Sequence, residues 1–406
     1  MNKILSCLIL LLLFSCGTRD KTSILMNEVI NSLPHEDSIH VCNLQENAAY
    51  RPSNESWKDS TSIRYYIDYP PAKDKEGNVI VDYFNDEDKM YIKTKTKIAA
   101  DQWAFAVLKD VHEVDKKEKA NAIITFKFLE DEGRGANLAL SSFPPAKGQY
   151  GKSTIRMDLA DMYDYIKARD KAKYTYYTVI LHEFGHLIGG LMHDSEFSVT
   201  DPTKVYSELQ IDDIAGARVN IRNFDDFTYK GITYTFIPNN KKNYNVTDNF
   251  TKKELLSKCT YHKYEIGHFL AENTIDALQF IRAYYGVPIK VNSSYRDINC
   301  NKIAGGAKLS QHQFRKALDW RFTGKKAQST ELKFISDITN QRGPFKELLN
   351  YKIRGFGTYP SGANHIDCRE VGIGNRRYGS IQYTVWGDFN KKGSFYNPTA
   401  EFEDYD

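Results

Sequence analysis

Two histidines four residues apart, with a glutamate directly after the first, are the feature that most constrains the fold of this chain. They are His182, Glu183 and His186, in the segment Leu181-His-Glu-Phe-Gly-His-Leu-Ile188. Residues four apart lie on one face of a helix, and a rigid face with two imidazoles can hold a zinc ion. The glutamate beside the metal can take a proton from water as that water attacks a carbonyl. The segment therefore predicts a helix over residues 174–188 that carries a zinc site and ends at Gly189-Gly190.

The residues around this motif resemble those of the metzincin proteases, particularly the matrixin-like branch. The stretch from His182 to Asp194 carries the resemblance, together with Asp212-Asp-Ile-Ala-Gly216, which is similar to the start of the last helix of those proteases. Strands expected over residues 122–128 and 153–157 stand where that fold has sheet strands. The resemblance covers residues 60–220 and implies a zinc peptidase domain that hydrolyses protein or peptide bonds, with Glu183 as a catalytic residue.

Two positions depart from the matrixin-like pattern. That family places its third histidine ligand six residues after the second, where this chain has Met192, and His193 follows one residue later. Because glycine tolerates left-handed backbone angles, Gly189-Gly190 can absorb the extra residue. We favour His193 as the third ligand, with Asp194 as the substitute. The second departure is Thr200, which stands where the family has a methionine in a turn beneath the metal.

A second set of candidate ligands lies in the C-terminal half. His312 and Asp319 are separated by six residues, and His365-Ile-Asp367 follows much later. Because the side chains of a strand alternate in direction, His365 and Asp367 lie on the same face if this segment is a strand. Nitrogen and carboxylate ligands of this kind suit zinc with one position open for water.

This second set resembles the zinc D-alanyl-D-alanine carboxypeptidases, whose fold is shared by the hedgehog signalling domain. The resemblance runs from Phe250 to Trp386 and includes the element Ser293-Ser-Tyr-Arg296. It implies that His312 and Asp319 bind zinc, and that His365 and Asp367 supply the third ligand and the acid/base group between them. We favour His365 as the ligand and Asp367 as the catalytic group, although the order can be reversed. Arg296 would stabilise negative charge on the attacked carbonyl or dock a substrate carboxylate.

This half of the chain also departs from its relatives. Many of them have glycine three residues after the first histidine, where this chain has Arg315. Some use a glutamate shortly before the last histidine as the base, whereas residues 361–364 here contain no acidic side chain. Asp367 can replace that glutamate, or hydrolysis is lost in this domain. The resemblance implies one zinc ion per domain and action of this domain on peptidoglycan peptides.

The N-terminus predicts export and a lipid anchor. Lys3 precedes an apolar run over residues 4–14 that is too short to span a bilayer, and Ser15-Cys16 follows it. This arrangement resembles the lipobox of bacterial lipoproteins, in which the signal is cut before the cysteine and the cysteine is acylated. It implies a protein of the bacterial cell envelope, attached to the outer membrane or the periplasmic face of a membrane through Cys16. The alternative is an ordinary signal peptide with an incidental cysteine.

Composition sets wider limits. A chain of 406 residues with 41% hydrophobic residues can form two domains with buried cores. The formal charge is only +3 and no basic stripe occurs, so no nucleic-acid partner is expected. Cys42, Cys259, Cys300 and Cys368 could form disulfides, but the pairing cannot be read from the sequence.

We therefore expect an α+β protein of two domains, each a small mixed or mainly antiparallel sheet with helices around a zinc site. The expected function is that of an envelope zinc metallopeptidase, and the alternative is a partly or wholly degenerate zinc-binding protein of the envelope or peptidoglycan. Two short strands, over 227–229 and 232–237, are expected within the linker. The expected segments are the signal (1–16), a tether (17–55), the first peptidase domain (56–222), the linker (223–249) and the second domain (250–406).

Overall fold

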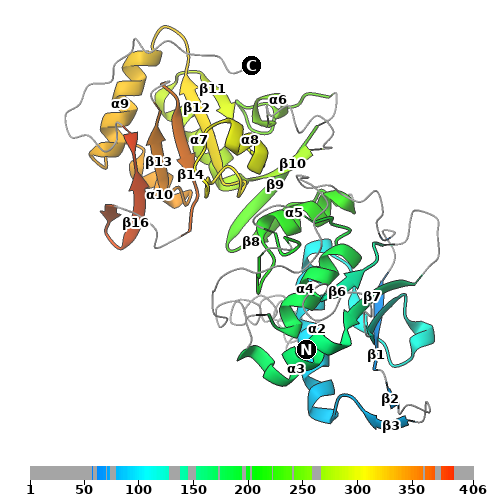
Figure 1. Cartoon of the computed structure of the whole chain (residues 1–406). Coiled ribbons are helices and arrows are strands. Elements are labelled where there is room, and N and C mark those ends of the chain that lie inside the picture. Colours follow the sequence, from blue (N-terminus) through cyan, green and yellow to red (C-terminus); the bar gives the residue numbers. More distant parts are fainter. Residues whose placement is uncertain are drawn as a thin grey trace, which may run out of the picture. The chain divides into compact units, whose positions relative to one another are not determined.

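The chain divides into two compact units, Met1–Asp213 and Ile214–Asp406 (Figure 1). The computed structural model describes residues 57, 62–69, 71–73, 79–127, 138–144, 152–171, 174–193, 198–201, 204–221, 223–239, 242–257, 267–359, 362–370 and 376–387. The signal, Cys16 and the tether lie outside these residues. Within the described part of the chain, no helix combines the length and the apolar character needed to cross a membrane.

The first unit is built on a five-stranded sheet of order β4-β1-β5-β7-β6. The first four strands in this order run parallel, and β6 pairs antiparallel with β7 at one edge. The central strand β5 is almost continuously apolar and buried, as expected for a parallel strand covered on both faces. The strands are β1 (Ile63–Asp68), β4 (Val111–Glu113), β5 (Ala122–Lys127), β6 (Ala139–Ser141) and β7 (Ser153–Asp158), beside a separate hairpin of β2 (Pro71–Lys73) and β3 (Val79–Asp82).

Two helices of this unit, α2 and α4, pack against each other, and their contact supports the first histidine motif. Helix α2 begins at a capping box between Asn85 and Asp88 and ends at Leu108, whose φ is 50°. The side chain of Trp103 on α2 is fully buried, and its indole N–H donates to the Leu181 carbonyl of α4 at 2.9 Å. The helices are α2 (Asp86–Val107), α3 (Leu159–Ala168) and α4 (Tyr176–Leu187), with short 3-10 helices at Lys117–Lys119 and Arg169–Lys171; α5 (Ile211–Asn220) begins in this unit and continues past its boundary at Asp213.

The second unit contains a three-stranded antiparallel sheet and a six-stranded mixed sheet. Their orders are β10-β9-β8 and β11-β12-β14-β13-β16-β15. Only β13 and β16 pair in parallel, so the sheet is otherwise antiparallel. The strands are β8 (Phe227–Tyr229), β9 (Ile232–Pro238), β10 (Gly267–Ala271), β11 (Ile289–Ser293), β12 (Ala317–Phe322), β13 (Gly355–Thr358), β14 (Asn364–Asp367), β15 (Arg376–Tyr378) and β16 (Ile381–Val385). The helices are α6 (Lys252–Leu255), α7 (Glu272–Tyr285), α8 (Ile298–Ile303), α9 (Ala327–Thr339) and α10 (Phe345–Asn350).

The expected α+β architecture of two parts is confirmed. The two short strands expected within residues 223–249 are β8 and β9, and β9 pairs with β10 over Tyr234–Pro238. The segment expected to be a linker thus contributes two strands to a sheet of the second unit. Cys300 is disulfide-bonded and Cys368 is a buried free thiol, while Cys42 and Cys259 lie outside the described residues.

Candidate metal sites

Helix α4 places the first pair of histidines. Its N-terminus is closed by a capping box in which the backbone N–H of Thr178 donates to the Thr175 hydroxyl at 3.2 Å. At its C-terminus, Gly190 has a φ of 63°, and the N–H of Leu191 donates back to the Gly185 carbonyl at 3.0 Å. The left-handed residue turns the chain sharply after the helix, as the glycine pair predicted. The chain is thereby led back toward the histidine face.

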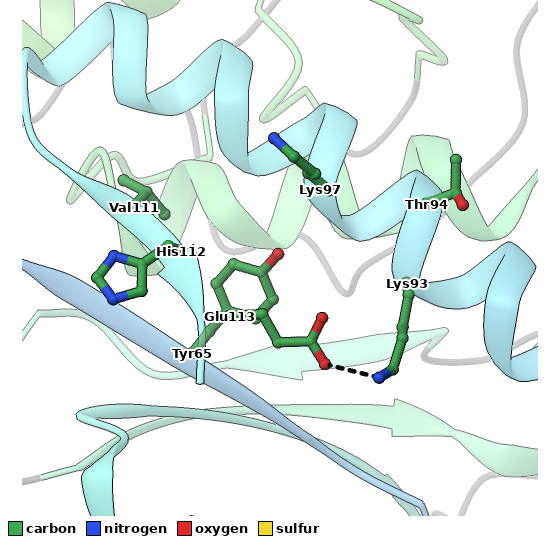
Figure 2. Close-up of a pocket in the computed structure, with 7 residues that line it drawn as sticks. All are labelled: Tyr65, Lys93, Thr94, Lys97, Val111, His112 and Glu113. Atoms are coloured by element: carbon green, nitrogen blue, oxygen red, sulfur yellow. Dashed lines mark ion pairs between the residues drawn. The ribbon is translucent and has the colours of Figure 1, made fainter. Parts of the chain in front are cut away.

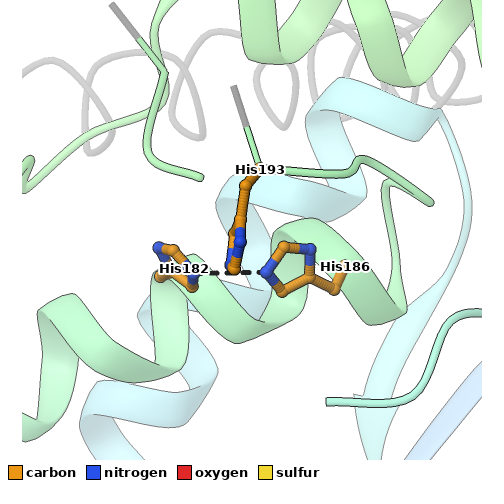
Figure 3. Close-up of side chains that lie close together, drawn as sticks. All are labelled: His182, His186 and His193. Atoms are coloured by element: carbon orange, nitrogen blue, oxygen red, sulfur yellow. Dashed lines mark hydrogen bonds between the residues drawn. The ribbon is translucent and has the colours of Figure 1, made fainter. Parts of the chain in front are cut away.

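Three imidazoles meet at this point. His182, His186 and His193 offer ligand atoms that all lie within 4.8 Å of one another, and Figure 3 shows their rings facing one another. The Nε2 atoms of His182 and His186 are 3.2 Å apart. Two nitrogen ligands about 2.0–2.1 Å from a tetrahedral zinc ion lie a little over 3 Å apart, so the spacing suits that metal. The structure thus brings together the three histidines that the sequence singled out, and Asp194 lies outside the described residues.

Backbone carbonyls orient the first two rings. His182 Nδ1 lies 2.8 Å from the Val199 carbonyl, and His186 Nδ1 lies 2.6 Å from the Leu191 carbonyl. Each Nδ1–H can donate to its carbonyl, which leaves Nε2 with a lone pair for a metal. Burial and the neighbouring imidazoles hold the pKa of His182 well below its usual range. Burial lowers the pKa of His186 to about 4, so both rings are neutral ligands near pH 7.

Glu183 has the environment expected of a base beside a cation. The residue is 1% exposed, and its Oε1 atom has no hydrogen-bond partner among the described residues. Burial raises the pKa of this carboxyl to about 8. A divalent cation at the three imidazoles would favour the charged carboxylate and offset its burial. A buried acid with one unpartnered oxygen, on the helix that carries two of three neutral imidazoles, fits a zinc ion.

The second cluster is formed where β12 and β14 lie side by side. Asp319 of β12 is paired in register with His365 of β14, and their Oδ1 and Nδ1 atoms are 2.8 Å apart. His312 reaches the same point from the segment before β12, with Nε2 3.1 Å from Asp319 Oδ1. His312 Nδ1 lies 2.5 Å from the Ser294 carbonyl, which orients the ring so that Nε2 faces Asp319. The three side chains form the second group that could hold a metal ion.

The second cluster contains a charged carboxylate, unlike the first cluster of three neutral imidazoles. Burial raises the pKa of Asp319, but His312 and His365 outweigh it and hold the pKa well below its usual range. Burial lowers the pKa of His365, but hydrogen bonds to Asp319 and Asp367 outweigh it and raise the pKa to about 8. The cluster therefore offers one ionised carboxylate and two imidazoles, a donor set that suits zinc.

Asp367 lies on the other side of the His365 ring from Asp319. Its Oδ2 atom is 2.9 Å from His365 Nε2, so Nδ1 is the atom of His365 that faces the ligand cluster. The Arg369 guanidinium donates to both oxygens, at 2.8 Å from Nε and 2.6 Å from Nη2, and the Arg369 backbone N–H donates at 3.0 Å. Each carboxylate oxygen thus accepts two hydrogen bonds, which uses its lone pairs. This geometry makes Asp367 an orienting partner of His365 and leaves it no free lone pair for a water proton.

Three residues that the sequence did not single out border the second cluster. The Tyr359 hydroxyl lies 3.3 Å from His365 Nδ1, the ligand side of the ring. The Trp386 ring lies 4.9 Å from the His365 ring between centroids, and the Arg369 guanidinium lies 5.2 Å from the Trp386 centroid. Arg296, which was singled out, donates to Asp319 Oδ2, and its Nε donates to Ser293 Oγ at 2.7 Å. Arg296 thus holds the ligand carboxylate in this structure.

Two glycines on β13 stand opposite the functional residues of β14 and leave room for the side chains around them. Gly355 is paired in register with Asp367, and Gly357 with His365. A Cβ atom on Gly355 would overlap the Asp367 carboxylate, and one on Gly357 would overlap the Trp386 ring. The spacing Gly-Phe-Gly is therefore matched to the spacing His-Ile-Asp across the two strands.

Replacing Gly355 by alanine is expected to lower the free energy of unfolding by about 1–3 kcal/mol, the usual cost of forcing an extra carbon into a packed interior. The added carbon must push the Asp367 carboxylate away from His365 Nε2. Thermal unfolding followed by circular dichroism measures the loss, and chelator competition measures the zinc affinity of the second cluster. If both stay unchanged, the packing between β13 and Asp367 described here is wrong.

A surface pocket of the first unit lies between α2 and β4 (Figure 2). Lys93 and Glu113 form an ion pair across it at 3.4 Å. Its lining contains none of the candidate ligands, so it provides positions for control variants in the same unit. The lining residues are Tyr65, Lys93, Thr94, Lys97, Val111, His112 and Glu113.

Two family models match the chain. The matrixin model matches residues 73–219, which contain Glu183 and the three clustered histidines. The peptidase M15 model matches residues 248–351, which contain His312 and Asp319. The chain joins a matrixin domain to a peptidase M15 domain. Both are families of metallopeptidases, so the protein is a zinc metallopeptidase, a hydrolase. A comparison with curated proteins gave no match.

The M15 match ends before the last ligand of its cluster. His365 lies on β14, beyond residue 351, and the pairing of β12 with β14 brings it to Asp319. Arg315, which stands where many M15 relatives have glycine, has a φ of 61°. A left-handed angle costs a side-chain-bearing residue roughly 1–2 kcal/mol, which explains the glycine of the relatives. In this M15 domain the Arg315 guanidinium lies 3.8 Å from the Tyr295 ring centroid, a cation–π contact that offsets part of this cost.

Proposed function

We propose that the protein is a lipid-anchored zinc metallopeptidase of the bacterial cell envelope. In this proposal the matrixin domain hydrolyses protein or peptide bonds, and the M15 domain acts on peptidoglycan peptides. The observation that carries the peptidase assignment is the buried Glu183, whose Oε1 atom has no hydrogen-bond partner among the described residues and which follows His182 of the three converging imidazoles.

The residues of the matrixin domain divide the chemistry between them. His182, His186 and His193 would hold zinc, which would supply a Lewis acid that acidifies water and polarises the peptide carbonyl. Glu183 accepts the proton of the attacking water and later delivers it to the leaving amine. Its burial keeps bulk water away from the carboxyl and raises its pKa above the usual value. Two backbone carbonyls fix the ring orientations of His182 and His186 before substrate arrives.

The roles of the side chains in the M15 domain follow from which nitrogen of the His365 ring each of them contacts, Nδ1 or Nε2. His312, Asp319 and His365 would hold the metal, while Asp367 fixes the ring of His365 through Nε2. The Tyr359 hydroxyl and the Arg296 guanidinium lie within hydrogen-bond distance of the ligand side chains His365 and Asp319. The proposed action on peptidoglycan rests on the family match and the resemblance to D-alanyl-D-alanine carboxypeptidases.

One observation favours a second function for the M15 domain. Both Asp367 oxygens are occupied by His365 and Arg369, so the carboxylate that could have served as the base is not free. The domain would then bind peptidoglycan peptides at a metal site and present the substrate to the matrixin domain. Release of peptide fragments from purified peptidoglycan distinguishes cleavage by this domain from binding alone.

Removal of metal is expected to abolish peptidase activity and zinc is expected to restore it. The purified chain should contain two zinc ions, one at each three-residue cluster. Treatment with 1,10-phenanthroline should reduce the cleavage of a casein substrate to background, since the base has no activated water to act on. Metal content is measured by mass spectrometry before and after zinc is added back. Full activity in the metal-free chain would contradict the proposed function.

The envelope anchor is tested separately from catalysis. Cys16, the proposed lipidation site, follows an apolar run that begins after Lys3. Cells that express the chain and are fed a labelled fatty acid should incorporate label into it, and the Cys16→Ser variant should carry none. Equal labelling of both chains would contradict the anchor.

A further inference from the structure

The segment between the second histidine, His186, and α5 contains both departures from the matrixin-like pattern. His193 follows the second histidine by one residue more than in those proteases, and Thr200 replaces the methionine of the turn beneath the metal. The structure brings the two departures into contact. The Thr200 hydroxyl donates to the Met192 carbonyl at 3.1 Å, and Met192 directly precedes His193. Because the peptide bond is planar, fixing this carbonyl restricts the orientation of the backbone that carries His193.

Thr200 is held firmly enough to act as such a support. Its side chain is fully buried, and the neighbouring Ser198 hydroxyl oxygen accepts from its backbone N–H at 3.0 Å. The Thr200 methyl group occupies the space beside Gly185, where a Cβ atom would overlap it. A methionine in this place would lack the hydroxyl, so it could not make the bond to Met192.

Asp213 anchors the same turn from its other side. This fully buried carboxylate accepts a hydrogen bond from Ser198 Oγ at 2.6 Å, from Val199 N at 3.1 Å and from Gln210 N at 2.6 Å. The Val199 carbonyl in turn lies 2.8 Å from His182 Nδ1. The turn Ser198–Thr200 is therefore one rigid piece that reaches two ligands, His182 through Val199 and His193 through Thr200.

We propose that Thr200 is a positioning residue of the first metal site, whose hydroxyl holds the Met192 carbonyl so that the longer segment delivers His193 to His182 and His186. The threonine and the extra residue compensate for each other, because the hydroxyl supports the backbone at the place where the chain has been lengthened. This role rests on the proposed binding of zinc by the three histidines, which the parent chain in the experiment tests on its own.

The experiment compares zinc affinities in the full chain. The second cluster is emptied by His312→Ala, so that chelator competition reports only the first site. In this parent, Thr200→Val keeps the shape of the side chain and removes the hydroxyl, while Thr200→Ser keeps the hydroxyl. Loss of an outer-shell partner typically weakens metal binding about 10–100-fold, so Thr200→Val should bind zinc at least about tenfold more weakly and Thr200→Ser should stay close to the parent.

Two controls separate positioning from folding. In a chain whose first site is emptied by His182→Ala, Thr200→Val should leave the zinc affinity of the second cluster unchanged. If Thr200→Val does not fold, as judged by circular dichroism, Thr200→Ser is compared with Thr200→Ala, which differ by the hydroxyl alone. Equal zinc affinity with and without the hydroxyl would overturn the positioning role. A parent that binds no zinc at all would instead overturn the first metal site itself.

Discussion

Replacing Glu183 by glutamine is expected to leave zinc on the chain and to slow casein cleavage about 10²–10⁴-fold, the usual contribution of a positioned general base. Glutamine has nearly the same shape, so the helix face that carries His182 and His186 is preserved. Its amide cannot accept a proton from water. Cleavage is followed with a fluorescent casein at saturating substrate, and zinc is counted by mass spectrometry.

A matched control for this variant lies in the same unit. Glu113 is a glutamate on β4, in the pocket of Figure 2, and it forms an ion pair with the partly exposed Lys93. Glu113→Gln should cleave casein at the parent rate. If Glu183→Gln is as active as Glu113→Gln, the matrixin domain is not the source of proteolysis. Loss of zinc from Glu183→Gln would show instead that this side chain supports the ligands.

The sequence predicted those parts of the protein that depend on local periodicity. The spacing of apolar residues and of the two histidines predicted a helix over 174–188, and α4 covers Tyr176–Leu187. The β-branched run after Ala122 predicted β5, which covers Ala122–Lys127. Period and propensity act within a few residues along the chain, so the sequence alone is sufficient to detect them.

The pairing of strands that lie far apart in the sequence was harder to predict. Residues 223–249 are rich in Asn, Lys and Tyr and were interpreted as a linker, yet β9 pairs with β10 along five residues. The first sheet is mixed, as expected, but which of its strand pairs are parallel could not be read from the sequence. Strand partners are set by contacts over long sequence separations, which composition and alternation do not encode.

The candidate ligands could be named from the sequence, but their orientation could not. The positions of His365 and Asp367 on one strand face left open which of them binds metal. The answer depends on the register of β14 against β12, which puts Asp319 at His365 Nδ1, and on Arg369, which binds Asp367 on the other side. The hydrogen bond from Thr200 to Met192 could not be predicted from the sequence either, because it forms only once the turn has folded against Asp213.

Replacing Asp367 by asparagine is expected to weaken zinc binding at the second cluster about 10–100-fold, the effect of losing a carboxylate that orients a ligating histidine. The carboxylate holds the proton of His365 on Nε2 and so keeps a lone pair on Nδ1 for the metal. An amide in its place holds that proton less firmly and leaves the Arg369 guanidinium without a counter-charge. The zinc affinity is measured by chelator competition in a chain whose first site is emptied by His182→Ala.

The result decides between the two roles that the sequence left open for Asp367. A general base can be removed without loss of metal, so Asp367→Asn would then keep its zinc and lose only hydrolysis. Removing an orienting partner weakens metal binding, so in that case zinc affinity and any hydrolysis by this domain should fall together. Asp337→Asn is the matched control, since Asp337 is a buried aspartate that accepts from Tyr285 and Lys333, at 2.9 and 2.7 Å, away from the cluster. Zinc binding that is as tight in Asp367→Asn as in Asp337→Asn would contradict the orienting role and return Asp367 to the position of a base.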